Sequence, residues 1–191
     1  RRYVGCVFVA AFLFGIVICY NSTAPFLFVQ ELGMTPDLYG MTMLFTVAGY
    51  AAGSFSAGRL IARMSPRAMI LIALAVALAG AAGLYLLSGQ LTVVYVLAPM
   101  VAYKFGFGLC VPPSMGAALA PFPRVAGSAS AMMGFAQMSA AGIASLLVLP
   151  LYDGTAGPLG LITLCLAGLA VVLFQLFVPA SQWVAARSES S

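Results

Sequence analysis

The fold is decided by residues 91–121, LTVVYVLAPMVAYKFGFGLCVPPSMGAALAP, because this long apolar run holds one charged residue deep inside it. Lys104 would lie about 20 Å along the run in a helix that rises ~1.5 Å per residue, far from both faces of a ~30 Å hydrocarbon layer. A lysine at the centre of a membrane helix costs ~2.5 to 3.5 kcal/mol to insert. We therefore expect Lys104 to face water, a partner or a substrate rather than lipid.

Two adjacent prolines follow in the same run, Pro112 and Pro113. Each proline removes a hydrogen bond inside a helix, and lipid cannot replace it. We predict that the helix is broken here and that this part of the run faces protein or a cavity.

The composition as a whole is that of a membrane protein. Of the 191 residues, 63% are hydrophobic and 6% are charged, whereas a soluble domain has about 25% charged residues. Polar and Pro/Gly clusters divide the chain into six apolar segments, each long enough to cross a bilayer: residues 3–30, 38–62, 67–88, 91–121, 125–151 and 157–179. The segments are continuously apolar and do not alternate as barrel strands would, so we predict an all-α membrane protein of six transmembrane helices.

Composition also excludes several functions. The eight Lys and Arg residues are spread along the chain and form no patch that could bind nucleic acid. Histidine is absent, which removes most hydrolase and metal sites, and the four cysteines show no CxxC spacing. We expect neither enzymatic activity nor a cofactor nor a metal.

The charged residues predict the orientation in the membrane. The basic ones fall at the N-terminus, in the second and fourth loops and in the C-terminal tail: Arg1, Arg2, Arg59, Arg63, Arg67, Arg124 and Arg187. Glu31, Asp37 and Asp153 fall on the other side. The positive-inside rule therefore places both termini in the cytoplasm, with Trp183 and Arg187 as interfacial anchors after the last helix. Arg1-Arg2 precede an apolar run too long for a signal peptide, so we expect the sequence to begin inside a longer protein.

The first segment carries a second interruption, residues 21–25, which end in Pro25. Interrupted helices at corresponding positions of two three-helix halves with opposite topology are typical of a transporter's binding site. The alternative is that Pro25, Pro112 and Pro113 are kinks of the kind that any membrane helix tolerates.

Small residues indicate where helices pack closely. Gly49 and Gly53 have GxxxG spacing, and the fifth segment has a similar face of Ala, Ser and Gly that includes Gln137. Gln137 fits either a hydrogen bond between helices or a cavity facing Lys104. The third and sixth segments are almost purely apolar and resemble lipid-facing support.

Two stretches resemble a known family. Residues 58–67, GRLIARMSPR, resemble the GxLaDRxGRR loop of the major facilitator superfamily, with Ala62 where the motif has Asp. Residues 121–130, PFPRVAGSAS, followed by Gly134 and Gln137, are similar to the start of the eleventh helix in its bicyclomycin- and chloramphenicol-resistance-type drug/proton antiporters. Tyr20 followed by Pro25-Phe26 is similar to their seventh helix. The loop residues that the resemblance covers are Gly58, Arg59, Arg63 and Arg67.

The resemblance implies that the chain is helices seven to twelve of a twelve-helix transporter in a bacterial inner membrane. Such proteins rock two six-helix bundles about a central site and export a small amphiphile as protons enter. The partner would then be the N-terminal six-helix half, which usually carries the proton-binding carboxylate. No carboxylate here lies at membrane depth, so proton coupling cannot be argued from these residues.

We therefore hypothesise half of a secondary transporter for apolar or amphiphilic drug-like molecules, with Lys104 offering positive potential to an anionic substrate or a partner. The residues predicted to line its cavity are Tyr20, Asn21, Tyr50, Lys104, Phe107, Ser114 and Gln137. Lys104 could instead snorkel, or cap carbonyls freed by the prolines. An alternative function is a six-helix membrane scaffold or assembly subunit without a transported solute.

Overall fold

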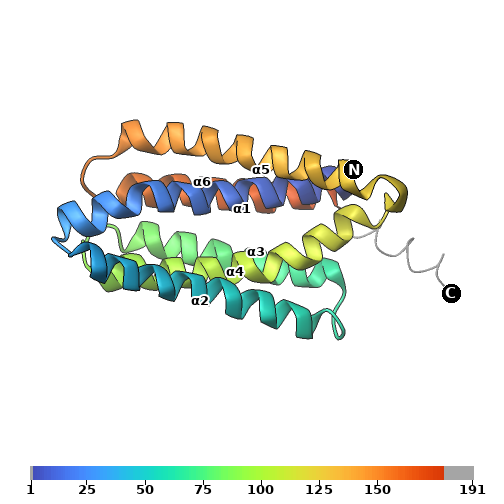
Figure 1. The fold of residues 1–191 in the computed structure, drawn as a ribbon, viewed down its shortest axis with the longest axis horizontal. Helices are drawn as coiled ribbons and strands as arrows, with labels where there is room; N and C mark the ends of the chain where they lie inside the picture. The colour runs from blue at the N-terminus through green and yellow to red at the C-terminus, as the bar shows by residue number, and fades with distance from the viewer. Residues whose placement is uncertain (1, 179–191) are drawn as a thin grey trace.

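A computed structural model describes residues 2–178, and these form six long α-helices joined by short links (Figure 1). The helices are α1 (Arg2–Pro25), α2 (Pro36–Leu60), α3 (Pro66–Leu86), α4 (Val93–Leu119), α5 (Ala126–Val148) and α6 (Gly157–Phe177). A π-helix, η1 (Phe26–Glu31), continues α1, and two 3₁₀ turns, η2 (Pro123–Val125) and η3 (Leu149–Leu151), flank α5. No strand occurs within residues 2–178. The predicted all-α membrane fold is confirmed; Trp183 and Arg187 lie outside the described residues.

Local chemistry explains where these helices begin. Pro36 and Pro66 occupy first-turn positions, where the missing N–H leaves no bond unmade. Ser65 caps α3, since its hydroxyl oxygen accepts a hydrogen bond from the Ala68 N–H at 3.3 Å. Gly33 adopts a φ of 63° between η1 and α2, a conformation that glycine reaches without strain.

Five stretches are long and apolar enough to cross a membrane: Arg2–Glu31, Pro66–Leu86, Val93–Leu119, Pro123–Leu151 and Gly157–Phe177. The exception is α2, which is less apolar because it carries several Gly, Ser and Thr residues. Figure 1 shows that α2 nevertheless runs the length of the bundle beside α4. Protein contacts rather than hydrophobicity alone hold this helix in place.

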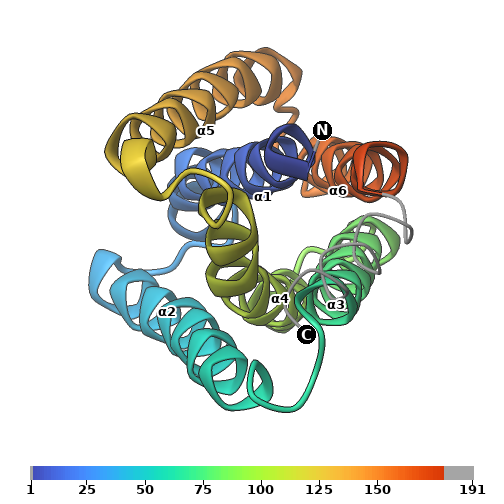
Figure 2. The same ribbon diagram turned by 90° about the vertical axis from the view of Figure 1, so that its right-hand side faces the viewer.

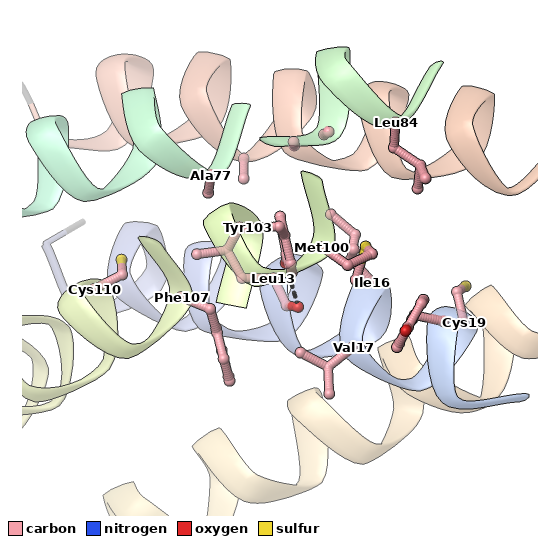
Figure 3. Close-up of a cluster of buried hydrophobic side chains, with 14 of the residues drawn as sticks. Leu13, Ile16, Val17, Cys19, Ala77, Leu84, Met100, Tyr103, Phe107 and Cys110 are labelled. Atoms are coloured by element: carbon pink, nitrogen blue, oxygen red, sulfur yellow. Dashed lines mark hydrogen bonds between the residues drawn. The ribbon is translucent and has the colours of Figure 1, made fainter. Parts of the chain in front are cut away.

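The six helices pack as two layers of three (Figure 2). One layer contains α1, α5 and α6, and the other contains α2, α3 and α4. The chain consists of two three-helix repeats, α1–α3 and α4–α6, and each layer combines the first helix of one repeat with the last two helices of the other. α1 packs on α5 and α6, while α4 packs on α2 and α3. Figure 3 shows the core between the layers, where the Tyr103 hydroxyl donates a hydrogen bond to the Leu13 carbonyl oxygen at 2.6 Å.

Glycines let α4 lie against the backbones of both its neighbours. A Cβ at Gly49 would come within 2.9 Å of the Val101 carbonyl oxygen, and one at Gly53 would overlap the Phe105 carbonyl oxygen. On the other side of α4, a Cβ at Gly106 would come within 2.6 Å of a backbone nitrogen of α3. The close packing predicted from Gly49 and Gly53 is confirmed.

The prolines do not break the helices as predicted. α4 is continuous through Pro112 and Pro113, and Figure 1 shows it curving toward α5 over its last turns. The bond lost at Pro112 is replaced: Pro112 cannot donate to the Gly108 carbonyl oxygen, and the Ser54 hydroxyl donates to that oxygen instead at 3.3 Å. After Pro25, the chain remains helical but widens into η1, where the Leu32 N–H donates to the Leu27 carbonyl oxygen five residues back.

The third and sixth segments are more than lipid-facing support. α3 buries one whole side against α4 and α6, including Met69, Ile70 and Leu74. The largest exposed apolar surfaces lie on α2 and α5 instead, with Leu44, Phe45, Met132, Phe135, Met138 and Leu146 among their members. These two helices bury little of their surface because α2 packs mainly against α4, and α5 mainly against α1.

The two ends of the bundle differ in charge. Arg2, Arg59, Arg63, Arg67 and Arg124 lie at the end that holds the α2–α3 and α4–α5 links, while Glu31, Asp37 and Asp153 lie at the opposite end. At that acidic end Asp153 organises the turn into α6, accepting hydrogen bonds from the Thr155 hydroxyl at 2.6 Å and N–H at 3.0 Å. These bonds hold the pKa of the Asp153 carboxyl below its usual value.

Candidate functional site

A cavity of about 330 Å³ opens between α1, α2, α4 and α5 at the middle of the bundle. This volume is at the lower end of the range for small-molecule sites, roughly 300 to 1,000 Å³. Its walls are formed by Phe14, Val17, Thr46, Val47, Tyr50, Lys104, Phe107, Val111, Met115 and Gln137. Helices of both layers therefore contribute to one hollow.

Lys104 is the charged residue of this cavity. It is 8% exposed and lies 11 residues into α4, which places it about 16 Å along the helix from Val93. The Nζ atom lies 5.9 Å from the ring centroid of Tyr20, within cation–π range. The carboxylates within residues 2–178 are Glu31, Asp37 and Asp153, all at the acidic end. None of them reaches the depth of Lys104.

The contacts of α4 answer part of the capping alternative for Lys104, the part that concerns the carbonyl freed by Pro112. The Gly108 carbonyl oxygen, which Pro112 leaves without its helical donor, is satisfied by Ser54 rather than by the lysine. The Lys104 side chain contributes to the cavity wall instead. Capping of this carbonyl is therefore not the role of Lys104.

Aromatic rings form one wall of the cavity. Phe107 is central: its ring centroid lies 5.5 Å from that of Tyr50 and 6.4 Å from that of Phe14. These rings come from three different helices, so their mutual contacts fix the spacing of α1, α2 and α4 around the hollow. A flat apolar molecule would find matching ring surfaces there.

The polar groups of the wall differ in what they can still bind. The Thr46 hydroxyl donates to the Met43 carbonyl oxygen at 2.9 Å, so its proton is already used within α2. Gln137 and Tyr50 line the cavity with groups that can donate or accept. Gln137 is half-buried, on the side of α5 that faces α4 across the hollow.

Four of the seven residues predicted to line the cavity do so: Lys104, Tyr50, Phe107 and Gln137. Tyr20 lies behind Lys104, fully buried, and its hydroxyl has no hydrogen-bond partner among the described residues.

Two of the predicted residues do not belong to the cavity wall. Asn21 is exposed on another side of α1, because one residue turns the helix by about 100° from Tyr20. Ser114 is buried, and its hydroxyl lies 3.4 Å from the Cys110 Sγ atom within α4. Both predictions were wrong because the depth of a residue in its segment does not tell on which side of the helix the residue lies.

Sequence reasoning missed several wall residues: Phe14, Val17, Thr46, Val47, Val111 and Met115. Their spacing held a usable signal. Phe107, Val111 and Met115 follow Lys104 by three, seven and eleven residues, which is one side of a helix, and Thr46 precedes Tyr50 by four. Placing Lys104 in a cavity would have predicted Val111 and Met115, and placing Tyr50 there would have predicted Thr46.

The predicted loop motif lies at the basic end, away from the cavity. Gly58 and Arg59 are exposed near the end of α2, and the Arg59 guanidinium carbon lies 4.0 Å from the Phe55 ring centroid. Arg63 is exposed in the link, and Arg67 is half-buried at the start of α3. Among residues 2–178, no three metal-ligating side chains come together.

Comparison with known proteins gives the family. The sequence model of the Major Facilitator Superfamily matches residues 1–145. The chain is similar to the multidrug resistance protein MdtL of Klebsiella pneumoniae, at 30% identity over 124 residues, 64% of this chain and 31% of that protein. MdtL of Citrobacter koseri gives the same identity over 124 residues, again 64% of this chain and 31% of the relative.

The matched part of the chain spans about a third of the length of these relatives. The family match covers most of the chain, and the structure has the long apolar helices that a transporter of this kind requires. The chain therefore belongs to the Major Facilitator Superfamily, a family of membrane transporters rather than enzymes.

Proposed function

We propose that this chain is the C-terminal six-helix half of a secondary transporter that exports small amphiphilic molecules by alternating access. Its relatives are named multidrug resistance proteins, which supports export of drug-like compounds. The partner in this proposal is an N-terminal six-helix half, packed against the exposed apolar sides of α2 and α5.

The observation that carries the proposal is the position of Lys104. A cation at membrane depth is costly to keep, and this one lies in the wall of a cavity beside aromatic rings. The cavity is bounded by helices of both layers, so a solute bound there would contact α1, α2, α4 and α5 together. Rocking of the two six-helix halves against each other would then change which groups the solute contacts, as alternating access requires.

Proton antiport is part of the proposal by family resemblance, and its acidic group is expected outside residues 2–178. The carboxylates within that range are confined to one end of the bundle. We further propose a bacterial inner membrane location with the basic end in the cytoplasm. The arginines at that end support this orientation through the positive-inside rule.

The test is efflux from a drug-sensitive bacterial strain that expresses the protein from its full reading frame, measured on a panel of acidic, neutral and basic antibiotics and dyes. Lys104→Ala should lower the export of at least one compound by about tenfold or more, since losing a charge-assisted contact costs ~1.5 to 3 kcal/mol. The matched control is Leu169→Ala, on an exposed side of α6 remote from the cavity.

Equal amounts of each variant in the membrane must be established by immunoblot. Wild-type protein that exports no compound, or a Lys104→Ala variant that exports all of them at wild-type rates, would contradict the cavity assignment. Export of no compound by the wild-type protein would favour the alternative of a membrane scaffold whose exposed apolar faces bind other helices.

A further inference from the structure

We infer that the cavity around Lys104 selects aromatic molecules that carry an anionic group, such as a carboxylate or phenolate, over the corresponding amines. This inference rests on the proposed function and adds the substrate class. It is carried by three features of the cavity: its charge, the unused hydrogen-bonding capacity of its cation, and its ring-lined wall.

The charge of the cavity wall is positive. Lys104 is its charged member, and the other polar members, Thr46, Tyr50 and Gln137, are neutral hydroxyl and amide groups. Glu31 lies 11 residues beyond Tyr20 along α1 and η1, about 16 Å away at the helical rise. An ammonium ligand would therefore meet a like charge in this half and find no counter-charge at that depth.

The cation also keeps its donors available. An ammonium has three N–H donors and no acceptor. Within residues 2–178 the contact that the structure records for Lys104 Nζ is the Tyr20 ring, at 5.9 Å from the centroid. The Gly108 carbonyl oxygen, the nearby backbone acceptor freed by Pro112, is already bonded to Ser54. A ligand carboxylate could accept charge-assisted hydrogen bonds from this ammonium.

The ring-lined wall selects the body of the ligand. Phe14, Tyr50 and Phe107 form a row of rings with centroid distances of 5.5 and 6.4 Å, and Val17 and Met115 complete an apolar surface. Stacked and edge-on ring contacts add to area burial at such sites. With about 330 Å³ in this half, the cavity suits a ligand of one or two fused rings.

The experiment compares three ligands of one shape: 2-naphthoate, 2-naphthamide and 2-naphthylmethylammonium. Binding to the purified full-reading-frame protein is measured at pH 7 by equilibrium dialysis, and uptake is measured in proteoliposomes. We expect the acid to bind about 10- to 100-fold more tightly than the amide, and the amine to bind most weakly.

Three variants separate the contributions. Lys104→Met should remove the preference for acid over amide, whereas Lys104→Arg, which keeps the positive charge, should retain it. Phe107→Ala should weaken acid and amide by the same factor, because the ring contact does not depend on charge. A purely structural role for Lys104 would weaken all ligands together and leave their ratio unchanged.

Tighter binding of the amine or the amide than of the acid by wild-type protein would overturn the inference, and so would an unchanged ratio in Lys104→Met. Tighter binding of the amine would indicate an acidic group at the site from elsewhere in the transporter, and an unchanged ratio would show that Lys104 does not set the preference. In that case, export of neutral or basic compounds in the efflux assay would still support the proposed function. Failure to export any compound would instead count against the proposed function itself.

Discussion

At the scale of single residues, Tyr103 joins the two layers of the bundle. Its side chain is fully buried on α4, and its hydroxyl donates to the Leu13 carbonyl oxygen of α1 at 2.6 Å (Figure 3). Lys104 is the next residue along α4. The hydrogen bond of Tyr103 thus fixes the rotation of α4 that directs Lys104 into the cavity.

We predict that Tyr103→Phe lowers the free energy of unfolding by about 1 kcal/mol, the typical net value of one hydrogen bond. The measurement is the thermal midpoint in detergent by fluorescence-detected size exclusion. Tyr85→Phe is the control, because that ring is exposed near the end of α3. Equal midpoints for wild type and Tyr103→Phe would contradict the structural role of this hydroxyl.

Some site residues could be predicted from the sequence, and the reason is energetic. A lysine inside an apolar run is costly wherever it faces lipid, so Lys104 could be assigned to a cavity or partner from composition and depth. Asn21 and Ser114 could not be assigned in the same way. Both are polar and near the right depth, but whether they face the cavity depends on the rotation and curvature of their helices.

At the scale of helices, α4 is held by backbone contacts on both sides. Gly53 of α2 lies against the Phe105 carbonyl oxygen, and Gly106 of α4 lies against the backbone of α3. Ser54, next to Gly53, bonds to the carbonyl that Pro112 leaves free. The tight contact and the proline are therefore coupled: α2 can replace the missing helical donor because no side chain separates it from α4.

We predict that Gly53→Ala destabilises the protein by ~1 to 3 kcal/mol, since its Cβ would overlap a carbonyl oxygen that cannot move without shifting α4. Gly40→Ala, in the same helix, is the matched control because nothing lies within 4 Å of the added Cβ. That control should be neutral or more stable by up to ~1 kcal/mol, from helix propensity.

The measurement is the thermal midpoint of both variants in the same detergent. A Gly53→Ala variant as stable as Gly40→Ala would mean that α2 and α4 are not in backbone contact.

The helices themselves follow closely from the sequence, because apolar length and starting prolines mark most of their ends. The expected breaks at Pro112 and Pro113 were wrong: α4 is continuous, and the donor that Pro112 lacks is supplied by Ser54, which is far away in sequence. The π-helix after Pro25 was also not expected. Its bonds span five residues, and their formation depends on local packing that no spacing rule records.

At the scale of the whole molecule, two asymmetries define the proposed transporter half. Charge separates along the long axis, with arginines at one end and carboxylates at the other. Across that axis, α1 packs with α5 and α6, and α4 packs with α2 and α3. This arrangement brings α1 and α4, the first helix of each repeat, to the cavity. The sequence indicated the charge separation, but the exchange of helices is a tertiary feature that periodicity does not specify.

The central claim is that this cavity holds the transported molecule, and protection of an engineered cysteine tests it most directly. Met115→Cys places a thiol in the wall at a position that is 39% exposed, in a Cys165→Ser background that removes the exposed native cysteine. N-ethylmaleimide labelling is followed by mass spectrometry in proteoliposomes. Leu169→Cys on α6 provides the matched control.

With an exported compound present at about ten times its Kd, roughly one site in eleven remains free, so labelling of Met115→Cys should slow by about tenfold. Labelling of Leu169→Cys should not change. If the compound is exported by this protein and yet slows neither thiol, or slows both equally, the cavity between α1, α2, α4 and α5 is not where the solute binds.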